Sequence, residues 1–128
     1  MEMEPAEVRK LFTQLKRAKL KTFPHFPKDL DAPDKRGVYI IYDPQDQVCH
    51  VGCSPRGKRG LYQRLRNHMD TQSSFTNSKL KWHGKKLRGR YKFRYLVVEH
   101  PRHRMLLECL AIGSLCPLHI GVHKSKKA

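Results

Sequence analysis

Residues 37–53, GVYIIYDPQDQVCHVGC, decide the fold of this chain. The two runs GVYIIYD and QVCHVGC are rich in the β-branched and aromatic residues that favour strands. The DPQD between them suits a tight turn with Pro44 at its second position. The stretch therefore predicts a β-hairpin, in which Tyr39 and His50 stand where plain β-branched residues would pack better.

The register of this hairpin decides which side chains share a face. A two-residue loop places Tyr39 opposite His50, whereas a four-residue loop places it opposite Gly52, with His50 on the diagonal. Because side chains alternate along a strand, both registers put the two rings on one face. A loop with an odd number of residues needs a β-bulge to keep them together. We therefore expect Tyr39 and His50 to face the same side of the sheet.

Length and charge narrow the class of protein. The chain has 128 residues, which suits one domain with a single modest core. Its net charge is +16, and residues 51–128 hold eighteen Lys and Arg against three Asp and Glu, whereas residues 1–50 hold nine against eight. Because Lys and Arg release condensed counterions when they neutralise phosphates, the expected partner is a nucleic acid.

Further elements are predicted on both sides of the hairpin. An apolar stripe in residues 4–20 predicts a helix of about four turns. Prolines interrupt residues 21–37, so we expect an extended connector whose Phe23 and Phe26 lie on the domain behind it. Residues 91–99, YKFRYLVVE, predict a third strand beside the hairpin. The stripe of the first helix consists of Val8, Leu11, Phe12 and Leu15.

Two more helices carry polar residues of interest. In residues 61–70, Arg64 and His68 lie four apart and form a polar stripe beside an apolar one, facing the same way. Residues 101–117 are apolar nearly all round, which predicts a largely buried helix. Glu108 sits in its middle, where a carboxylate is costly unless it is paired, hydrogen-bonded or bound to a metal. A salt bridge to an arginine and a metal site both meet that requirement.

The order of these motifs resembles the GIY-YIG endonuclease superfamily. GVY is followed by ten residues, HVG, a basic loop, LYQRLRNH on a helix and LLECLAIGSLCP on a later helix. The resemblance covers residues 37 to about 120 and implies an α/β (α+β) fold, with a small three-stranded, mainly antiparallel sheet flanked by helices. We expect residues 35–123 to form this domain, residues 1–34 to be an appended helix and connector, and residues 124–128 to be a basic tail.

The resemblance implies catalytic roles for five residues. Tyr39 matches the motif tyrosine that activates or positions the attacking water, and Arg64 matches the arginine that clamps the scissile phosphate. His68 would accept or relay the phenol proton. Glu108 matches the ligand of one divalent cation, Mg²⁺ or Mn²⁺. His50 replaces the second motif tyrosine; its unperturbed pKa of about 6.5 suits proton transfer, so it either shares the base role or marks a site that only binds.

One further departure concerns the segment after the last helix. The asparagine of the family pattern is absent, and His119 and Ile120 stand in its place. A histidine near a helix end is more often a surface or capping group, although His119 is a candidate to serve for the asparagine.

The resemblance and the charge together predict a metal-dependent endonuclease that hydrolyses phosphodiester bonds in nucleic acid, with DNA favoured over RNA. A catalytically inactive nucleic-acid-binding module and a ribosome-associated basic protein are the alternatives. Because one site cuts one strand at a time, the N-terminal helix is a candidate homodimer surface. The residues expected to contact the nucleic acid are Arg56, Lys58, Arg59, Arg66, Ser74, Asn77 and Lys79.

The cysteines and the hydropathy bear on location. The four cysteines form no CxxC pair, so reduced thiols are expected. A zinc site at Cys109, Cys116, His119 and His123 is disfavoured, because no close pair seeds it and Cys109 is expected to be buried. The first thirty residues contain no apolar leader segment, and no stretch is long enough to span a bilayer, so we expect a cytoplasmic protein without membrane contact.

Overall fold

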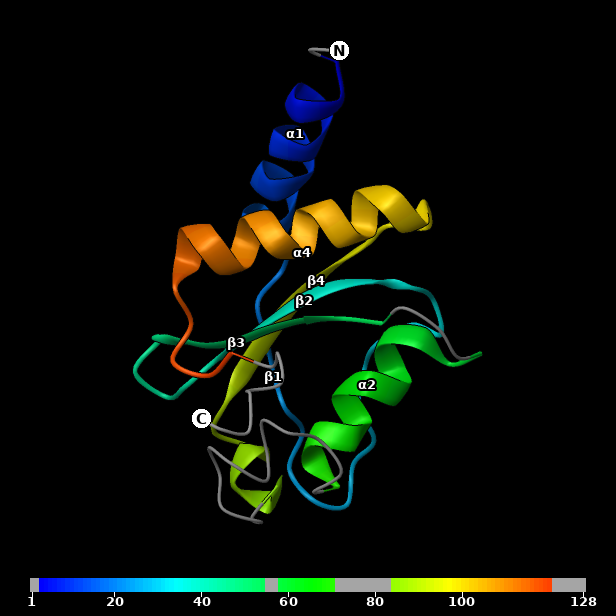
Figure 1. Cartoon of the computed structure of the whole chain (residues 1–128). Coiled ribbons are helices and arrows are strands. Elements are labelled where there is room, and N and C mark those ends of the chain that lie inside the picture. Colours follow the sequence, from blue (N-terminus) through cyan, green and yellow to red (C-terminus); the bar gives the residue numbers. More distant parts are fainter. Residues whose placement is uncertain (1–2, 55–57, 71–83, 121–128) are drawn as a thin grey trace, which may run out of the picture.

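The computed structural model describes residues 3–54, 58–70 and 84–120. Four antiparallel strands form one sheet in the order β1-β4-β2-β3, with α1 and α4 on one face and α2 on the other (Figure 1). The fold is therefore mixed α/β. The elements are α1 (Met3–Arg17), β1 (Lys21–Thr22), β2 (Gly37–Tyr42), β3 (Val48–Cys53), α2 (Gly60–Met69), the 3-10 helix η1 (Gly84–Leu87), β4 (Lys92–Val97) and α4 (Pro101–Leu115).

The sheet has four strands where the sequence predicted three. The additional strand, β1, lies in the predicted connector, and its Lys21 and Thr22 pair with Phe93 and Lys92 of β4. The prolines that interrupt regular structure follow this short strand rather than precede it, so nothing prevents the pairing. The predicted third strand, now β4, lies beside β2 as expected.

The hairpin has the predicted turn and a bulge that fixes its register. Tyr39 pairs with Gly52 and Ile41 with His50, but Tyr42 pairs with Val48, so the register shifts by one residue at a β-bulge. This bulge compensates for the odd-numbered loop 43–47. The rings of Tyr39 and His50 lie 6.1 Å apart, centroid to centroid, which confirms that they share a face.

Two apolar cores lie on the two faces of the sheet. Tyr39 and Ile41 point into the core shared with α2, whereas Val38 and Ile40 point into the core shared with α1 and α4. The apolar stripes of the first two helices are buried as predicted, except that Leu11 is half-buried. The buried stripe residues are Val8, Phe12, Leu15, Leu61, Leu65 and Met69.

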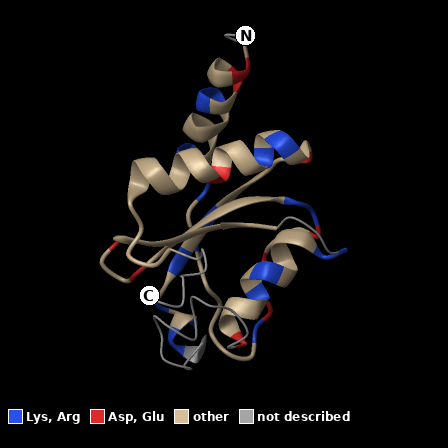
Figure 2. Cartoon of the chain, in the orientation of Figure 1, with Lys and Arg blue, Asp and Glu red and all other residues tan. Residues whose placement is uncertain are grey.

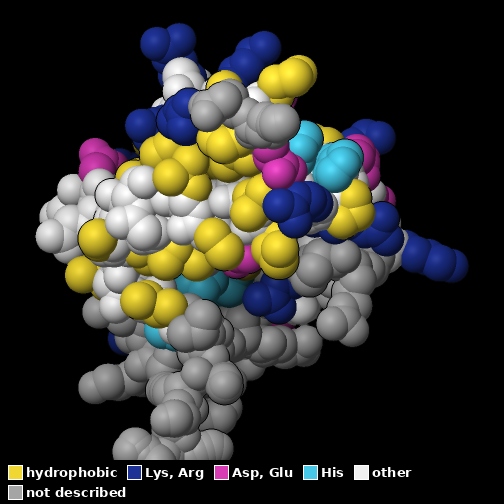
Figure 3. Space-filling model, turned by 45° about the horizontal axis from the view of Figure 1, so that its top comes forward, with side chains coloured by type: hydrophobic (Ala, Val, Ile, Leu, Met, Phe, Trp, Pro, Cys, Tyr) yellow, Lys and Arg dark blue, Asp and Glu magenta, His cyan; other side chains and the backbone are white. Residues whose placement is uncertain are grey.

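The last helix is less buried than its composition predicted. Only Arg104, Leu107 and Ala111 of α4 are buried, because α4 is an outer layer that covers the sheet with one face (Figure 1). Met105 is 53% exposed, and Cys109, which was expected to be buried, is exposed. Figure 3 shows hydrophobic side chains gathered on the surface around this helix. Apolar composition alone therefore overestimated the burial of α4.

The connector also differs from expectation at one aromatic residue. Phe23 is fully buried, as expected, but Phe26 is 80% exposed. The main chain turns at this point, because Lys28 N donates to His25 O at 2.8 Å. The turn directs Phe26 away from the domain, where its ring lies beside the Arg88 guanidinium.

Candidate active site

The candidate site lies at the edge of the sheet, where side chains from the helices on its two faces can come together. β3 is an edge strand, α2 covers one of its faces, and α4 covers the other. Near the end of β3, Gly52 lies opposite Tyr39 on the α2 side, and the next residue, Cys53, faces α4. Side chains from both helices therefore meet at Gly52 and Cys53.

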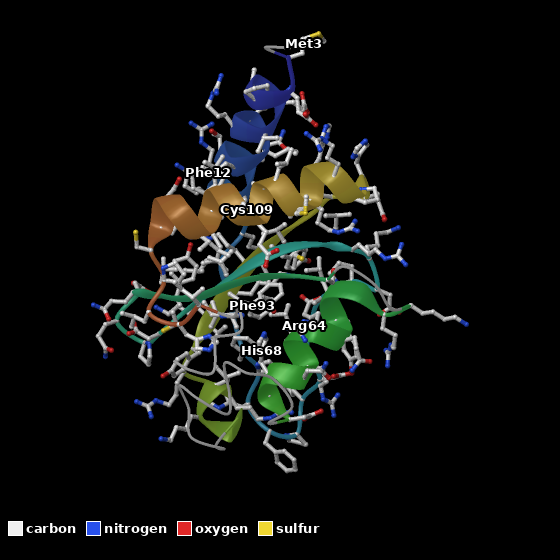
Figure 4. All side chains as sticks on the ribbon, viewed as in Figure 1. Met3, Phe12, Arg64, His68, Phe93 and Cys109 are labelled. Carbon is white, nitrogen blue, oxygen red and sulfur yellow. The ribbon has the colours of Figure 1, made fainter. Side chains whose placement is uncertain are left out.

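Tyr39 forms a buried hydrogen bond with a histidine. Its hydroxyl oxygen lies 2.6 Å from His68 Nε2, and the Arg64 guanidinium lies near enough to lower the pKa of the phenol. A ring nitrogen of neutral histidine that carries no hydrogen is an acceptor, so the phenol is able to donate to His68 Nε2. Figure 4 shows Arg64 and His68 together on α2. The i, i+4 stripe predicted from the sequence therefore brings both side chains to Tyr39.

Burial dominates the protonation of this group. Desolvation raises the pKa of Tyr39 well above its usual value, against the nearby Arg64 guanidinium, which lowers it. Desolvation also holds the pKa of His68 well below its usual value, helped by His50, Arg64 and His119. His68 is consequently neutral near pH 7, so its Nε2 is able to accept the phenol hydrogen.

Gly52 supplies the space for the Tyr39 hydroxyl. A Cβ atom at this position would lie 2.4 Å from Tyr39 Oη and 3.2 Å from His50 Nε2. The glycine is needed here for close approach, because any larger residue would occupy the place of the hydroxyl. The same geometry shows that His50 Nε2 and the Tyr39 hydroxyl border one space.

His50 lies between two other histidines. Its ring centroid is 5.1 Å from that of His68 and also 5.1 Å from that of His119, and its Nδ1 is 3.1 Å from His119 Nδ1. Burial lowers the pKa of His50 to about 3, and the charges of His119 and Arg64 act in the same direction. The structure thus adds His119 to the site. No periodicity in the sequence connects position 119 with position 50.

Glu108 approaches the site from α4. Its carboxylate lies close to the Cys53 thiol, and desolvation and the nearby Glu108 raise the pKa of that thiol to about 12. Arg104 and Arg64 act in the opposite direction on Cys53, so both cations are also close by. Glu108 is half-buried rather than enclosed in the core as its place in an apolar helix suggested. Figure 2 shows a single acidic band in the middle of α4, which carries no other acidic residue.

The donor set suits a cation that keeps most of its water. Within residues 3–54, 58–70 and 84–120, no three His, Cys, Asp or Glu side chains are grouped closely enough to hold a metal. Mg²⁺ is commonly bound by one or two carboxylates, several waters and the substrate phosphate, so Glu108 alone is a sufficient protein ligand of that type. Figure 3 shows histidine, acidic and basic side chains close to one another on the surface.

Two of the predicted nucleic-acid contacts have carboxylate partners. Arg59 lies 3.6 Å from Asp34, and Arg66 lies 3.2 Å from both Asp29 and Asp70, so they also join α2 to the connector and to its own C-terminal end. Lys58 is exposed. The remaining predicted contacts lie outside the described residues: Arg56, Ser74, Asn77 and Lys79. The candidate zinc ligand His123 and the basic tail, residues 124–128, lie outside them as well.

Comparison with known proteins gives no family assignment. No protein-family model and no curated protein matches this chain. No helix among the described residues is long and apolar enough to cross a membrane. A function must therefore be inferred from the chemistry of the residues at the β3 edge.

Proposed function

We propose that this chain is a metal-dependent endonuclease that hydrolyses phosphodiester bonds in nucleic acid, with DNA favoured over RNA, on a GIY-YIG-like fold. The observation that carries the proposal is the hydrogen-bonded pair Tyr39 and His68 with the Arg64 guanidinium close by, at the same strand end that Glu108 reaches from α4. The net charge of +16 supports a polyanionic substrate.

Arg64 is the residue that would bind the scissile phosphate. Its Nε is buried and has no hydrogen-bond acceptor among the described residues, and its charge lies close to Tyr39. A phosphate oxygen would satisfy this donor, and the fixed positive charge would stabilise the charge that develops in the transition state. Arg94 Nε also has no hydrogen-bond partner among the described residues. Arg94 lies on β4, however, and its guanidinium donates through another nitrogen to Lys16 O of α1.

Tyr39 would position the attacking water. Its raised pKa makes the phenol a poor base by itself, so a neutral imidazole must take the proton. His68 Nε2 lies 2.6 Å from the hydroxyl, and His50 Nε2 borders the same space beside Gly52. The site therefore contains two acceptors with suitable positions.

Glu108 would hold one divalent cation, Mg²⁺ or Mn²⁺, together with water and the phosphate. When bound, such an ion polarises the phosphate and stabilises the leaving oxygen. The Cys53 thiol lies beside the Glu108 carboxylate and would help to orient it.

One observation favours a second candidate function. Tyr39 and His68 are both fully buried, and complete burial restricts direct access of water to the phenol. This arrangement would also suit a catalytically inactive module that keeps the fold and binds nucleic acid through its basic surface. Pairing of two chains through α1 stays a prediction.

A nicking assay separates the two candidates. Supercoiled plasmid is incubated with Mg²⁺ or Mn²⁺ and either the wild type, Glu108→Gln or the control Glu99→Gln, whose carboxylate is exposed beyond the end of β4. We expect nicking by the wild type and the control, and a loss of at least about a hundredfold in Glu108→Gln, which keeps the shape of the side chain.

Two results would refute the endonuclease. One is equal nicking by the wild type and Glu108→Gln. The other is no nicking by any protein with either metal on plasmid, single-stranded DNA or RNA. Metal-independent binding that weakens steeply with salt, without cleavage, would identify the binding module instead.

A further inference from the structure

The segment after α4 is fixed against the outer edge of β3. Leu118 N donates to Val48 O at 3.2 Å, and His119 N donates to Cys49 O at 2.8 Å. These main-chain bonds hold residues 118–119 beside the strand that carries His50. The half-buried ring of His119 is thereby held at a defined position rather than extended into solvent.

His50 presents its two ring nitrogens to different neighbours. Nδ1 lies 3.1 Å from Nδ1 of His119. Nε2 faces the space beside Gly52, where a Cβ atom would lie 3.2 Å from it and 2.4 Å from Tyr39 Oη. One nitrogen is therefore directed to His119 and the other to the reacting end of Tyr39.

The contact with His119 couples the protonation of the two rings. Two Nδ1 atoms at hydrogen-bond distance require that one donates and the other accepts. The main chain of His119 favours the protonated form of the His50 ring, as expected when a ring N–H faces a carbonyl oxygen. A proton on Nδ1 of neutral His50 agrees with this effect, because His50 Nδ1 is then the donor and His119 Nδ1 the acceptor.

We propose that His119 is a positioning residue that holds the proton of His50 on Nδ1 and so leaves Nε2 as a proton acceptor beside Tyr39. This inference rests on the proposed nuclease function and deepens it. In the hydrolytic step, Nε2 takes a proton from water as the water oxygen forms its bond to phosphorus. The bond from phosphorus to the leaving oxygen breaks, the oxygen keeps the electron pair and takes a proton from a solvent water, and His50 returns the Nε2 proton to solvent.

Every element packed against His50 contributes to its charge environment. Tyr39 faces it from β2, Arg64 and His68 from α2, and His119 from the segment after α4; Glu108, beside Cys53, lies at the adjacent end of β3. Burial and the nearby cations keep His50 neutral before substrate binds. A bound phosphate would offset the charge of Arg64, and it would thereby favour protonation of His50 during the reaction.

The test compares the wild type with His119→Phe, which keeps a ring but removes the acceptor, and His119→Asn, which retains an acceptor. Leu118→Ala is the matched control, since Leu118 is 53% exposed and its main-chain bond remains. Nitrogen-15 NMR of labelled histidines reports which nitrogen of His50 is protonated. Nicking rates across pH report the base, and metal-free DNA binding and thermal unfolding serve as checks on folding.

We expect Nδ1–H on His50 in the wild type and a mixture of tautomers in His119→Phe. The nicking rate of His119→Phe should fall by about tenfold to a hundredfold, with a shifted acid limb, while His119→Asn stays within about threefold of the wild type. Unchanged rate and pH profile in a folded His119→Phe, or a proton on Nε2 of wild-type His50, would overturn the inference. Absence of nicking by every protein would refute the nuclease function separately, and the tautomer of wild-type His50 would still decide the role of His119.

Discussion

Replacing Gly52 with alanine should disable the site through a single methyl group. The added Cβ would lie 2.4 Å from Tyr39 Oη and 2.6 Å from Tyr39 Cζ, whereas ordinary contacts begin at 3.4 Å. The hydroxyl must therefore move by about 1 Å, in a ring that is fully buried. That movement would break its 2.6 Å contact with His68 Nε2.

The expected magnitude follows from these distances. Misplacement of a reacting group by about 1 Å costs about a hundredfold in rate, and overpacking a buried site costs about 1–3 kcal/mol of unfolding free energy. The assays are plasmid nicking with Mg²⁺ and urea unfolding followed by circular dichroism. The nicking rate of Gly52→Ala should fall by about a hundredfold, and its unfolding midpoint should fall modestly.

Gly113→Ala is the matched control. Among the described residues, nothing lies within 4 Å of the added Cβ at this exposed position of α4, so the substitution should preserve nicking. It should also stabilise the protein by about 0.5–1 kcal/mol, because alanine is the better helix former. Gly52→Ala with wild-type nicking and stability would refute the placement of the Tyr39 hydroxyl against Gly52.

Two further predictions concern stability and thiol reactivity. The pKa of His50 is about 3 in the folded state, below the usual 6.5 of a histidine in the unfolded chain. Between these two pH values the unfolded state therefore binds a proton at His50 that the folded state does not bind. The free energy of unfolding consequently falls as pH falls from 6.5 towards 3, by about 1.4 kcal/mol per pH unit. The urea midpoint should therefore fall less steeply with acid in His50→Gln than in the wild type, and parallel curves would contradict a buried neutral histidine. Cys109 and Cys116 are exposed, whereas the thiol of Cys53 has its pKa raised to about 12, so mass spectrometry after brief alkylation at pH 8 should find Cys53 modified last of the three. Equal labelling of the three would place Cys53 away from Glu108.

The residues predictable from the sequence are those whose positions follow from local periodicity. Alternation along the hairpin placed Tyr39 and His50 on one face for a loop of two or four residues, and the bulge preserves that parity for the odd-numbered loop observed. The i, i+4 spacing likewise placed Arg64 and His68 on one side of α2, and the structure brings both to Tyr39. Each of these inferences needs only the geometry of one element.

The features that the sequence did not predict depend on how distant elements meet. His119 reaches His50 because residues 118–119 return to the edge of β3, and no pattern in residues 101–120 indicates that return. The burial of Glu108 depends on which face of α4 lies on the sheet, but an apolar pattern that runs nearly all round a helix has no preferred face. The prediction that Phe26 packs on the domain was wrong for the same reason, because the exposure of Phe26 depends on a turn in an irregular segment.

The edge position of β3 explains why this part of the sheet can form a site. On an interior strand, a neighbouring strand would separate the side chains of α2 from those of α4. At the edge, the return segment occupies the carbonyls of Val48 and Cys49 and leaves the end at Gly52 and Cys53 to side chains from both faces. A single phosphate placed there could contact a cation from α2 and a carboxylate-bound metal from α4 at once. The small size of Gly52 is then required, because it admits the phenol from within the sheet to this end of the strand.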